Sequence, residues 1–556
     1  MKTAGAKARS KPEAAPGIRL SFSTRASALI LIGITVILLV PFAGKAFNMD
    51  DPLFMWSAKY IHSHFLDPYG FRVNWYLDVQ PMWNVTKNPP LACYYIALWA
   101  FIIGWSEPAL HLAFLIPAIA VVLGTFFLAR EFCAKPLEAT LAAILTPVFL
   151  ISGTTVMCDV MMLAFWVWAV FLWVRGMEKN RHGLLATAMV LVTLSALTKY
   201  FGIALIPLLA VYSIVKTRRP GMWMLHLLIP VAILAGYQVA TKSLYGRGLL
   251  SDAGGYAAFY QADTLAQAVT RLLTGFIFTG GCILTALFFA PLLWSRRGLT
   301  IGFVIAVLAF VGFSLKPIGT FLPVGPLWPT GLQMALLFAG GVGLLALAVQ
   351  DYLSRRDALS LVLLLWVAGT FIFASVLNWS VNGRSILPMA PAAGILIMRR
   401  IGRLHPTKDL TRYMCIPLAA ALIVSLLVLF ADYQLADSGR NAAGEVASSR
   451  TEEGRTIWFE GHWGFQYYME SEGGKAVEFA TFEPKKGDIL ILPSNNTNLL
   501  IEDPDAPCVH VFIYRPIVKL STMHKAVGAG FFSDTWGPLP FAIGPLPPEY
   551  YGVFQY

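Results

Sequence analysis

The sequence predicts a polytopic α-helical membrane protein with a C-terminal α/β domain, and three observations support this fold class. Of 556 residues, 57% are hydrophobic and only 13% are charged, whereas about a quarter of the residues in soluble domains are charged. Apolar runs of about 17 to 25 residues, long enough to cross a bilayer, recur from residue 27 to residue 431. From residue 432 to residue 556, short β-rich runs bounded by Gly, Pro and Asn replace them.

The net charge of +11 is distributed unevenly along the chain. Of 31 acidic and 42 basic residues, 16 and 9 follow Ala431, which leaves 15 and 33 in the membrane part. Basic residues gather in the cytoplasmic loops of membrane proteins, so the excess needs no nucleic-acid partner. Residues 1–26 hold six basic residues and one acidic residue. They are therefore predicted to be a cytoplasmic basic tail.

Basic clusters also set the predicted topology of residues 27–431. If every apolar run crossed the membrane, the cluster at Arg130 would lie outside. An outside position would conflict with the cytoplasmic location expected of basic clusters. The conflict disappears if the short run Pro89–Trp105 lies in the interface or re-enters instead of crossing. About thirteen transmembrane helices then follow, with residues 432–556 outside. The clusters that this arrangement places in the cytoplasm are Arg130–Lys135, Arg175–Arg181, Lys216–Arg219, Arg296–Arg297, Arg355–Arg356 and Arg399–Arg412.

The same topology brings charged residues from distant parts of the chain to the outer face. An outer loop, residues 44–108, carries juxtamembrane helices, and short outer turns follow later in the chain. The residues placed together on this face are Asp50, Asp51, Asp159, Lys199 and Arg384.

The adjacent acids Asp50 and Asp51 differ in their local context. Asp51 precedes Pro52, and an Asp cap with proline at the first helical position is a common helix start. The structural interpretation of Asp51 is therefore a cap on a juxtamembrane helix. Asp50 has no such local role, and a carboxylate at the membrane face is a functional candidate.

The remaining outer residues have both structural and functional interpretations. Asp159 is either a helix cap or part of a site, and Lys87, Lys199 and Arg384 are either interfacial cations or phosphate ligands. Together they provide what a reaction with a leaving phosphate needs. A carboxylate can take the proton of the incoming hydroxyl, and cations can bind the departing phosphate oxygens.

In the C-terminal part, "WFEGHWGFQYYME" is dense in aromatic residues and predicts a helix near Trp463–Ser471. His462 and Trp463 lie in this stretch. An aromatic core is one interpretation, because such side chains dominate burial in small domains. Stacking on a sugar is the other.

Five motifs resemble those of the GT-C membrane glycosyltransferases, in the family of the protein O-mannosyltransferases, the lipid A aminoarabinose transferase and the Rgt-type transferases. The resemblance covers roughly residues 27–400. The motifs are an acidic pair (Asp50-Asp51, where the family usually has Asp-Glu), "KNPPL" (with Lys87 one place before the family's basic position, which Asn88 occupies), Asp159, "TKYFG" (Lys199) and "RSILPMAP" (Arg384, with Ser385 in place of a tyrosine).

The resemblance implies an inverting glycosyltransferase whose donor is a polyprenyl-phosphate-linked sugar and whose acceptor is a hydroxyl of a lipid, glycan or protein. Asp50 is the expected catalytic base, and Arg384, Lys199 and Lys87 the expected donor-phosphate ligands. Asp51 and Asp159 would orient sugar or acceptor, and the segment after Pro89 would line the prenyl groove. No cofactor is certain; a divalent metal, if used, would bind Asp50 and Asp159. The implied location is the bacterial inner membrane, with a periplasmic C-terminal domain.

Two alternatives remain open from the sequence. A transporter or flippase would place ionisable residues near the bilayer midplane and break helices at repeat-related positions. Here the acids lie near one face. An oligosaccharyltransferase-like ligase would share the fold but differ in its donor and in its need for a divalent ion.

Overall fold

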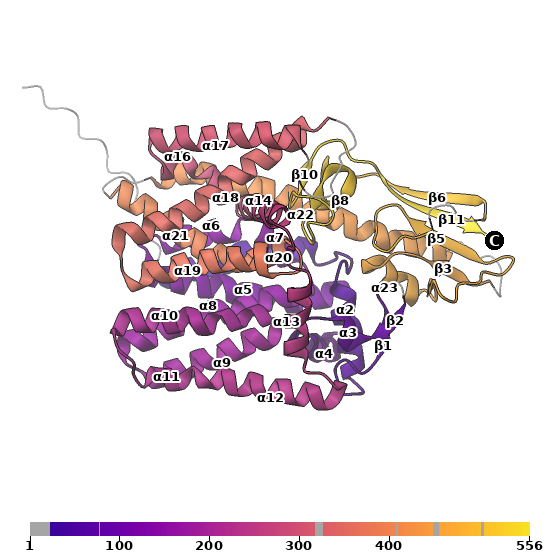
Figure 1. Cartoon of the computed structure of the whole chain (residues 1–556), viewed down its shortest axis with the longest axis horizontal. Helices are drawn as coiled ribbons and strands as arrows, with labels where there is room; N and C mark the ends of the chain where they lie inside the picture. Colours follow the sequence, from indigo (N-terminus) through magenta and orange to yellow (C-terminus); the bar gives the residue numbers. More distant parts are fainter. Residues whose placement is uncertain are drawn as a thin grey trace, which may run out of the picture.

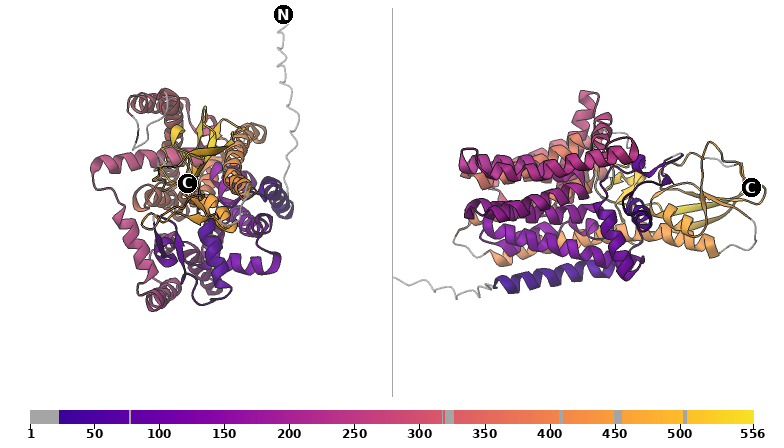
Figure 2. Two further views of the ribbon diagram at one scale, coloured as in Figure 1. Left: turned by 90° about the vertical axis from the view of Figure 1, so that its right-hand side faces the viewer. Right: turned by 90° about the horizontal axis from the view of Figure 1, so that it is seen from below.

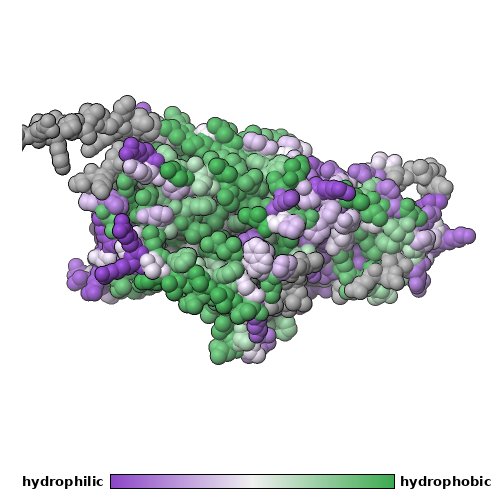
Figure 3. All heavy atoms as spheres, turned by 90° about the horizontal axis from the view of Figure 1, so that it is seen from above, coloured by the Kyte–Doolittle hydropathy of each residue, from purple (hydrophilic) through white to green (hydrophobic). Residues whose placement is uncertain are grey.

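The computed structural model describes residues 23–76, 78–316, 318, 326–406, 410–448, 455–501 and 505–556. Most of the predicted basic tail lies outside these residues. Helices form a bundle, and the C-terminal domain projects from one end of it (Figure 1), here called the domain side. Figure 3 shows a broad apolar surface over the bundle with hydrophilic residues toward both ends, as expected for a multi-pass membrane protein.

Within the described residues, nine helical segments are long and apolar enough to cross a membrane. They are α1 with the 3-10 turn η1 (Thr24–Phe42), α5 (Glu107–Phe132), α8 (Cys158–Lys179), the 3-10 turn η2 with α10 (Tyr200–Thr217), α11 with α12 (Trp223–Tyr245), α17 (Arg296–Leu315), α18 (Trp328–Arg355), α19 with the π-helical turn η3 (Ala358–Leu377) and α22 (Thr411–Ser448).

Four further stretches of the described bundle consist of shorter or broken helices, whereas about thirteen transmembrane helices were predicted in all. Three of these four contain prolines in the first turn of a helix, where the missing N–H is not needed. The four are α6 with α7 (Pro136–Ile144, Pro147–Ser152), α9 (His182–Thr198), α14 with α15 and α16 (Leu265–Cys282, Leu284–Phe288, Ala290–Leu293), and α20 with the 3-10 turn η4 and α21 (Gly383–Ile386, Leu387–Met389, Ala390–Leu404).

The chain between α1 and α5 lies on the domain side. It forms α2 (Asp51–Ile61), the hairpin of β1 (Arg72–Asn74) and β2 (Val79–Pro81), α3 (Met82–Val85) and α4 (Leu91–Ile103). At 13 residues, α4 is about 20 Å long, shorter than the hydrocarbon core of a bilayer. Figure 1 places it next to α2 and α3, as expected for the short run predicted not to cross.

Basic clusters lie at the opposite end of the bundle. The helices α8, α10 and α18 run from the domain side and end at Asn180, Arg218 and Arg356, each in the left-handed conformation that commonly terminates helices. These C-terminal ends carry three of the predicted cytoplasmic clusters. Charged residues of the two predicted faces are thus separated along the bundle.

The last helix joins the two parts of the molecule. α22 has 38 residues and spans about 57 Å, so it continues beyond a bilayer. It runs without a break through Ala431, where the sequence analysis placed the domain boundary. Figure 2 shows it extending along the bundle toward the domain.

The C-terminal domain contains a five-stranded mixed sheet in the order β4-β3-β5-β11-β6. β3 is parallel to β4 and β5, whereas β11 is antiparallel to β5 and β6. The helix α23 (Trp463–Ser471) has the predicted position. The strands are β3 (Ile457–Phe459), β4 (Lys475–Ala476), β5 (Ile489–Pro493), β6 (Cys508–Tyr514) and β11 (Glu549–Gln555).

Two small two-stranded sheets of the domain pack against the bundle. Their strands are β7 (Leu520–Ser521) with β10 (Ala542–Ile543), and β8 (Met523–His524) with β9 (Ala529–Gly530). Buried residues of this segment, including Phe531 and Leu539, belong to the same hydrophobic core as the membrane helices. The five-stranded sheet has a separate core with α22 and α23.

Glycines allow α14 and α18 to approach closely. A Cβ at Gly280 would lie 1.8 Å from the carbonyl oxygen of Leu337, and one at Gly341 would lie 2.1 Å from that of Phe276. We therefore expect Gly280→Ala to force the helices apart and to cost about 1–3 kcal/mol. The matched control is Gly343→Ala on α18, where the added methyl meets nothing within 4 Å. Equal melting temperatures of the two purified variants would contradict this close packing.

Candidate active site

A cavity of about 570 Å³ lies where the bundle meets the C-terminal domain. Its described charged lining residues are three cations and one carboxylate, a balance that favours an anionic ligand. The lining residues are Met49, Asp50, Leu53, Phe54, Trp75, Tyr76, Val85, Thr86, Lys87 and Asn88; Cys158, Lys199, Tyr200, Phe201, Leu250, Ala253, Gly254, Tyr256, Ala257 and Tyr260; Phe373, Leu377, Asn378, Trp379, Asn382, Arg384 and Ser385; and, from the C-terminal domain, Trp463, Thr497, Asn498, Met523, Phe532, Ser533, Thr535 and Trp536.

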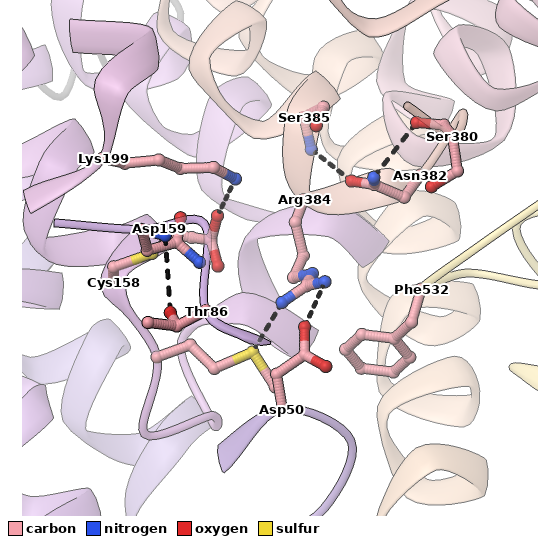
Figure 4. Close-up of polar contacts among 12 residues, drawn as sticks. Asp50, Thr86, Cys158, Asp159, Lys199, Ser380, Asn382, Arg384, Ser385 and Phe532 are labelled. Carbon is pink, nitrogen blue, oxygen red and sulfur yellow. Dashed lines mark hydrogen bonds and ion pairs between the residues drawn. The ribbon is translucent and has the colours of Figure 1, made fainter. Parts of the chain in front are cut away.

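Asp50 lies immediately before α2 and points into the cavity. Although it occupies the N-cap position, its side chain caps no backbone N–H of the helix. Its Oδ2 instead lies 2.7 Å from Nη2 of Arg384, and the carboxylate is 33% exposed (Figure 4). The one carboxylate on the cavity wall is therefore available to a ligand.

Arg384 has unused hydrogen-bonding capacity. Its short helix α20 is capped by Asn382, whose side chain accepts from the N–H of Ser385. The guanidinium contacts Asp50 through Nη2, while Nη1 has the weak thioether acceptor Met157 Sδ at 3.0 Å. Among the described residues, its buried Nε has no hydrogen-bond partner. An anionic oxygen in the cavity would satisfy these donors.

Asp159 and Lys199 form a second ion pair behind the first. Asp159 Oδ1 lies 2.6 Å from Lys199 Nζ. Asp159 is in the first turn of α8, but Met157 occupies the cap position, so the capping interpretation is wrong. Asp159 is 1% exposed and is not among the residues that line the cavity, whereas Lys199 lines it. Asp159 thus positions Lys199 and does not itself reach the cavity.

Asp51 is neither a cap nor a cavity residue. It is the first residue of α2, and its carboxylate accepts from the N–H groups of Asn48 and Val156, both at 2.9 Å. Burial raises the pKa of Asp51 to about 7. The side chain fixes the turn that presents Asp50 and ties it to the segment before α8. The predicted helix cap is thus corrected to a link between two segments.

Lys87 lines the cavity but is already paired. Its Nζ lies 2.6 Å from Asp252 Oδ2 and 5.3 Å from the centre of the Tyr256 ring, both on α13 (Leu249–Phe259). Arg247 contacts the other oxygen of Asp252 at 3.1 Å. Asp252 is a partner that the sequence analysis did not consider, and it holds α13 against the cavity.

The two aromatic candidates of the C-terminal domain differ in their position relative to the cavity. His462 is buried, its Nδ1 bonds with Gln466 and its Nε2 with the carbonyl of Tyr76, and it does not line the cavity. Both of its ring nitrogens are thus engaged within the protein. Trp463 does line the cavity, and its ring centre lies 4.9 Å from that of Trp536.

The side chains around the cavity that could act as metal ligands do not fit a divalent metal. Among the described residues, no group of three or more His, Cys, Asp or Glu side chains could hold one. Asp50 and Asp159, the expected ligands, are each paired with a cation. A second positive charge at either carboxylate would meet repulsion from that partner.

The C-terminal domain fixes the loop that carries Arg384. The N–H of Gly383 donates to the carbonyl of Phe531 at 2.7 Å, and Asp534 bonds with both backbone groups of Val381. The ring of Phe532 lies 5.6 Å from the Arg384 guanidinium carbon. The sequence analysis missed this segment, although "FFSDTW" combines aromatic and hydroxyl side chains as binding sites often do.

Comparison with known proteins gives one family match. Residues 87–245 match the model described as dolichyl-phosphate-mannose-protein mannosyltransferase. No curated protein matches the chain.

Several solved structures are similar to this chain. The oligosaccharyltransferase of Archaeoglobus fulgidus in the apo form is 15% identical, with a TM-score of 0.48 over 81% of this chain and 64% of that one. ArnT from Cupriavidus metallidurans bound to undecaprenyl phosphate is 13% identical, with a TM-score of 0.42 over 85% and 94%. Arabinosyltransferase EmbB from Mycobacterium smegmatis is 15% identical, with a TM-score of 0.32 over 92% and 48%.

The segment matched by the family model carries Lys87, Asp159 and Lys199. The match supports the predicted resemblance to the protein O-mannosyltransferases over residues 87–245.

Proposed function

We propose that the protein is an inverting glycosyltransferase that moves a sugar from a polyprenyl-phosphate donor to a hydroxyl acceptor at the domain side. The observation that carries the proposal is the Asp50–Arg384 pair on the cavity wall, where an accessible carboxylate adjoins a guanidinium whose buried Nε has no hydrogen-bond partner among the described residues. A base and an anion-binding group are thus in contact in one cavity, as this reaction requires.

In the proposed step, Asp50 takes the proton of the acceptor hydroxyl. The hydroxyl oxygen forms a bond to the anomeric carbon while the bond from that carbon to the phosphate oxygen breaks, and polyprenyl phosphate leaves. Asp50 loses negative charge as the phosphate gains it. Arg384 contacts Asp50 and has a further N–H donor, Nε. Its guanidinium can therefore stabilise the negative charge first on Asp50 and then on the departing phosphate, with little movement of the side chain.

The other cations of the cavity assist in this scheme. Lys199, oriented by Asp159, is the second phosphate ligand, and Lys87 is a third once the phosphate competes with Asp252. The apolar lining suits the first isoprene units, and it comes from residues such as Phe201, Leu250 and Phe373. None of the residues of α4 lines the cavity, so the prenyl groove expected after Pro89 is assigned to these residues instead.

The proposed location is the bacterial inner membrane, with the N-terminus in the cytoplasm and the C-terminal domain in the periplasm. Basic residues at the end of the bundle opposite the cavity support this orientation. A donor carried on a lipid reaches this side of the membrane, where nucleotide sugars would be absent.

An in vitro assay with a panel of polyprenyl-phosphate sugars, run with and without a chelator, tests the proposal. We expect release of polyprenyl phosphate at the same rate in both conditions, because both carboxylates already have cationic partners. Loss of activity with chelator, or use of diphosphate-linked oligosaccharides alone, would favour the ligase alternative. Movement of intact donor between leaflets without bond cleavage would indicate a flippase and contradict the proposal.

A further inference from the structure

The wall of the cavity formed by the C-terminal domain adjoins the proposed base directly. Phe532 lies against the guanidinium of Arg384, which in turn contacts Asp50 (Figure 4). If the donor phosphate binds the cavity cations of the membrane part, which are Lys87, Lys199 and Arg384, the acceptor must reach Asp50 along this wall. The chemistry of the wall then determines which acceptors fit.

From this arrangement we propose that the domain wall is an acceptor subsite for an uncharged saccharide, an inference that rests on the proposed function. Among the described residues, all those that the domain contributes to the lining are uncharged. A phosphorylated lipid headgroup would require cations here. Lys525 lies 4.7 Å from the centre of the Trp536 ring, but it does not line the cavity. The wall therefore suits a neutral acceptor.

The wall combines the two kinds of group that a saccharide needs. Trp463 and Trp536 both line the cavity, with exposed fractions of 9% and 6%, and their ring centres lie 4.9 Å apart with the rings tilted by 54°. The C–H groups on one face of a sugar ring are weakly positive and pack well against the negative face of an aromatic ring. Ser533 and Thr535 supply hydroxyls, 2.9 Å apart, beside them. Such polar groups on an aromatic wall can fix the orientation of a sugar's hydroxyls.

Backbone strain marks the same cavity. Six non-glycine residues of the described chain have positive φ, and three of them end helices at the opposite end of the bundle. The other three, Met49, Trp463 and Asn498, all line the cavity, with φ of 50°, 59° and 54°. This conformation is uncommon for bulky residues such as Met49 and Trp463, although Asn adopts it more readily, and such strain typically persists at ligand sites. Two of the three belong to the domain wall.

A peptide acceptor fits this wall less well. Extended peptides commonly bind by adding a strand to the edge of a sheet. No described residue of the domain's five-stranded sheet lines the cavity. Among the described lining residues from the domain, Met523 of the two-residue strand β8 is the one that lies in a strand, so the five-stranded sheet presents no edge to the cavity, which favours a saccharide.

Substitutions in the wall should separate acceptor binding from donor cleavage. We expect Trp536→Leu and the near-isosteric Thr535→Val to raise KM for a neutral oligosaccharide acceptor, by about tenfold for the tryptophan. Slow hydrolysis of the donor by water, measured on the same variants, reports donor cleavage separately from acceptor binding. Trp536→Phe should retain most of the affinity. Trp458→Leu, in β3 and outside the cavity, is the matched control.

Saccharide binding should also be measured directly, by quenching of tryptophan fluorescence with neutral oligosaccharides in the Asp50→Asn variant. Binding that Trp536→Leu weakens and Trp458→Leu does not would support the subsite. Binding that is absent, or unchanged in Trp536→Leu, would overturn it, as would transfer only to peptides or phosphorylated lipids. Failure of the unmodified protein to cleave any donor would instead contradict the proposed function, and fluorescence would still decide whether the wall binds saccharides.

Discussion

Asp50→Asn should reduce sugar transfer by about 10²- to 10⁴-fold, the usual contribution of a general base. The amide has the same shape as the carboxylate, and its oxygen can still accept from Arg384. It cannot, however, take the proton of the acceptor hydroxyl. Because the side chain of Asp50 is partly exposed and caps no helix, expression and folding should be retained. Release of sugar from a polyprenyl-phosphate donor, followed by mass analysis, measures the effect.

Asp78→Asn provides the matched control for this prediction. Asp78 lies in the same outer segment, is exposed, accepts from Gln80 Nε2 at 2.9 Å and does not line the cavity. Its substitution should leave transfer unchanged. Near-normal turnover of the Asp50 variant would remove Asp50 from the mechanism, even if Arg384→Gln remained inactive.

Lys45→Met should lower the free energy of unfolding by about 3–5 kcal/mol, because removing one partner of a buried ion pair leaves the other charge uncompensated. Lys45 follows η1 and pairs with Asp432 in α22, and their side chains are 1% and 0% exposed. The hydroxyl of Thr522, in the C-terminal domain, donates to the other oxygen of Asp432 at 2.9 Å. This pair joins the first helix, the last helix and the domain. Thermal unfolding in detergent should therefore shift to clearly lower temperature.

A double variant distinguishes the lost charge balance from lost packing. Lys45→Met combined with Asp432→Leu removes both charges, and we expect it to recover most of the stability. Lys59→Met is the control for removing an exposed lysine near the same end of the bundle; Lys59 Nζ donates to Tyr467 at 3.0 Å. If Lys45→Met and Lys59→Met unfolded at the same temperature, the buried pair would not stabilise the domain contact.

Apolar run length and basic clusters predicted much of this molecule. They indicated a polytopic helical bundle, in which nine described helical segments are long and apolar enough to cross a membrane, and the short segment that became α4. They also placed Asp50, Asp159, Lys199 and Arg384 at one end of the bundle, where the structure joins them in two ion pairs. Such features are readable from a sequence because each depends on a short stretch of residues and on the cost of moving charge across a bilayer.

Local patterns failed where a residue's role depends on a distant partner. The sequence "DDP" suggested a capping role for Asp51, but its carboxylate reaches the backbone at Val156, 105 positions away. Asp252 offered no local signal, yet it pairs with Lys87 across 165 positions. A hydrogen bond requires atoms to approach within about 3 Å, whereas topology specifies only a face of the membrane.

The sequence by itself therefore determined that this is a multi-pass helical membrane protein with its candidate acid and cations at one end and an α/β domain after them. Only the tertiary structure decided that the segment from Leu520 to Ala542 packs into the core of the bundle, that Phe531 and Asp534 hold the loop of Arg384, and that Asp50 faces a wall of Phe532 and Trp536. These contacts join parts of the chain more than a hundred residues apart. They depend on how the helical bundle packs against the C-terminal domain. Each of these two units can be predicted from the sequence, but no local sequence pattern encodes their packing.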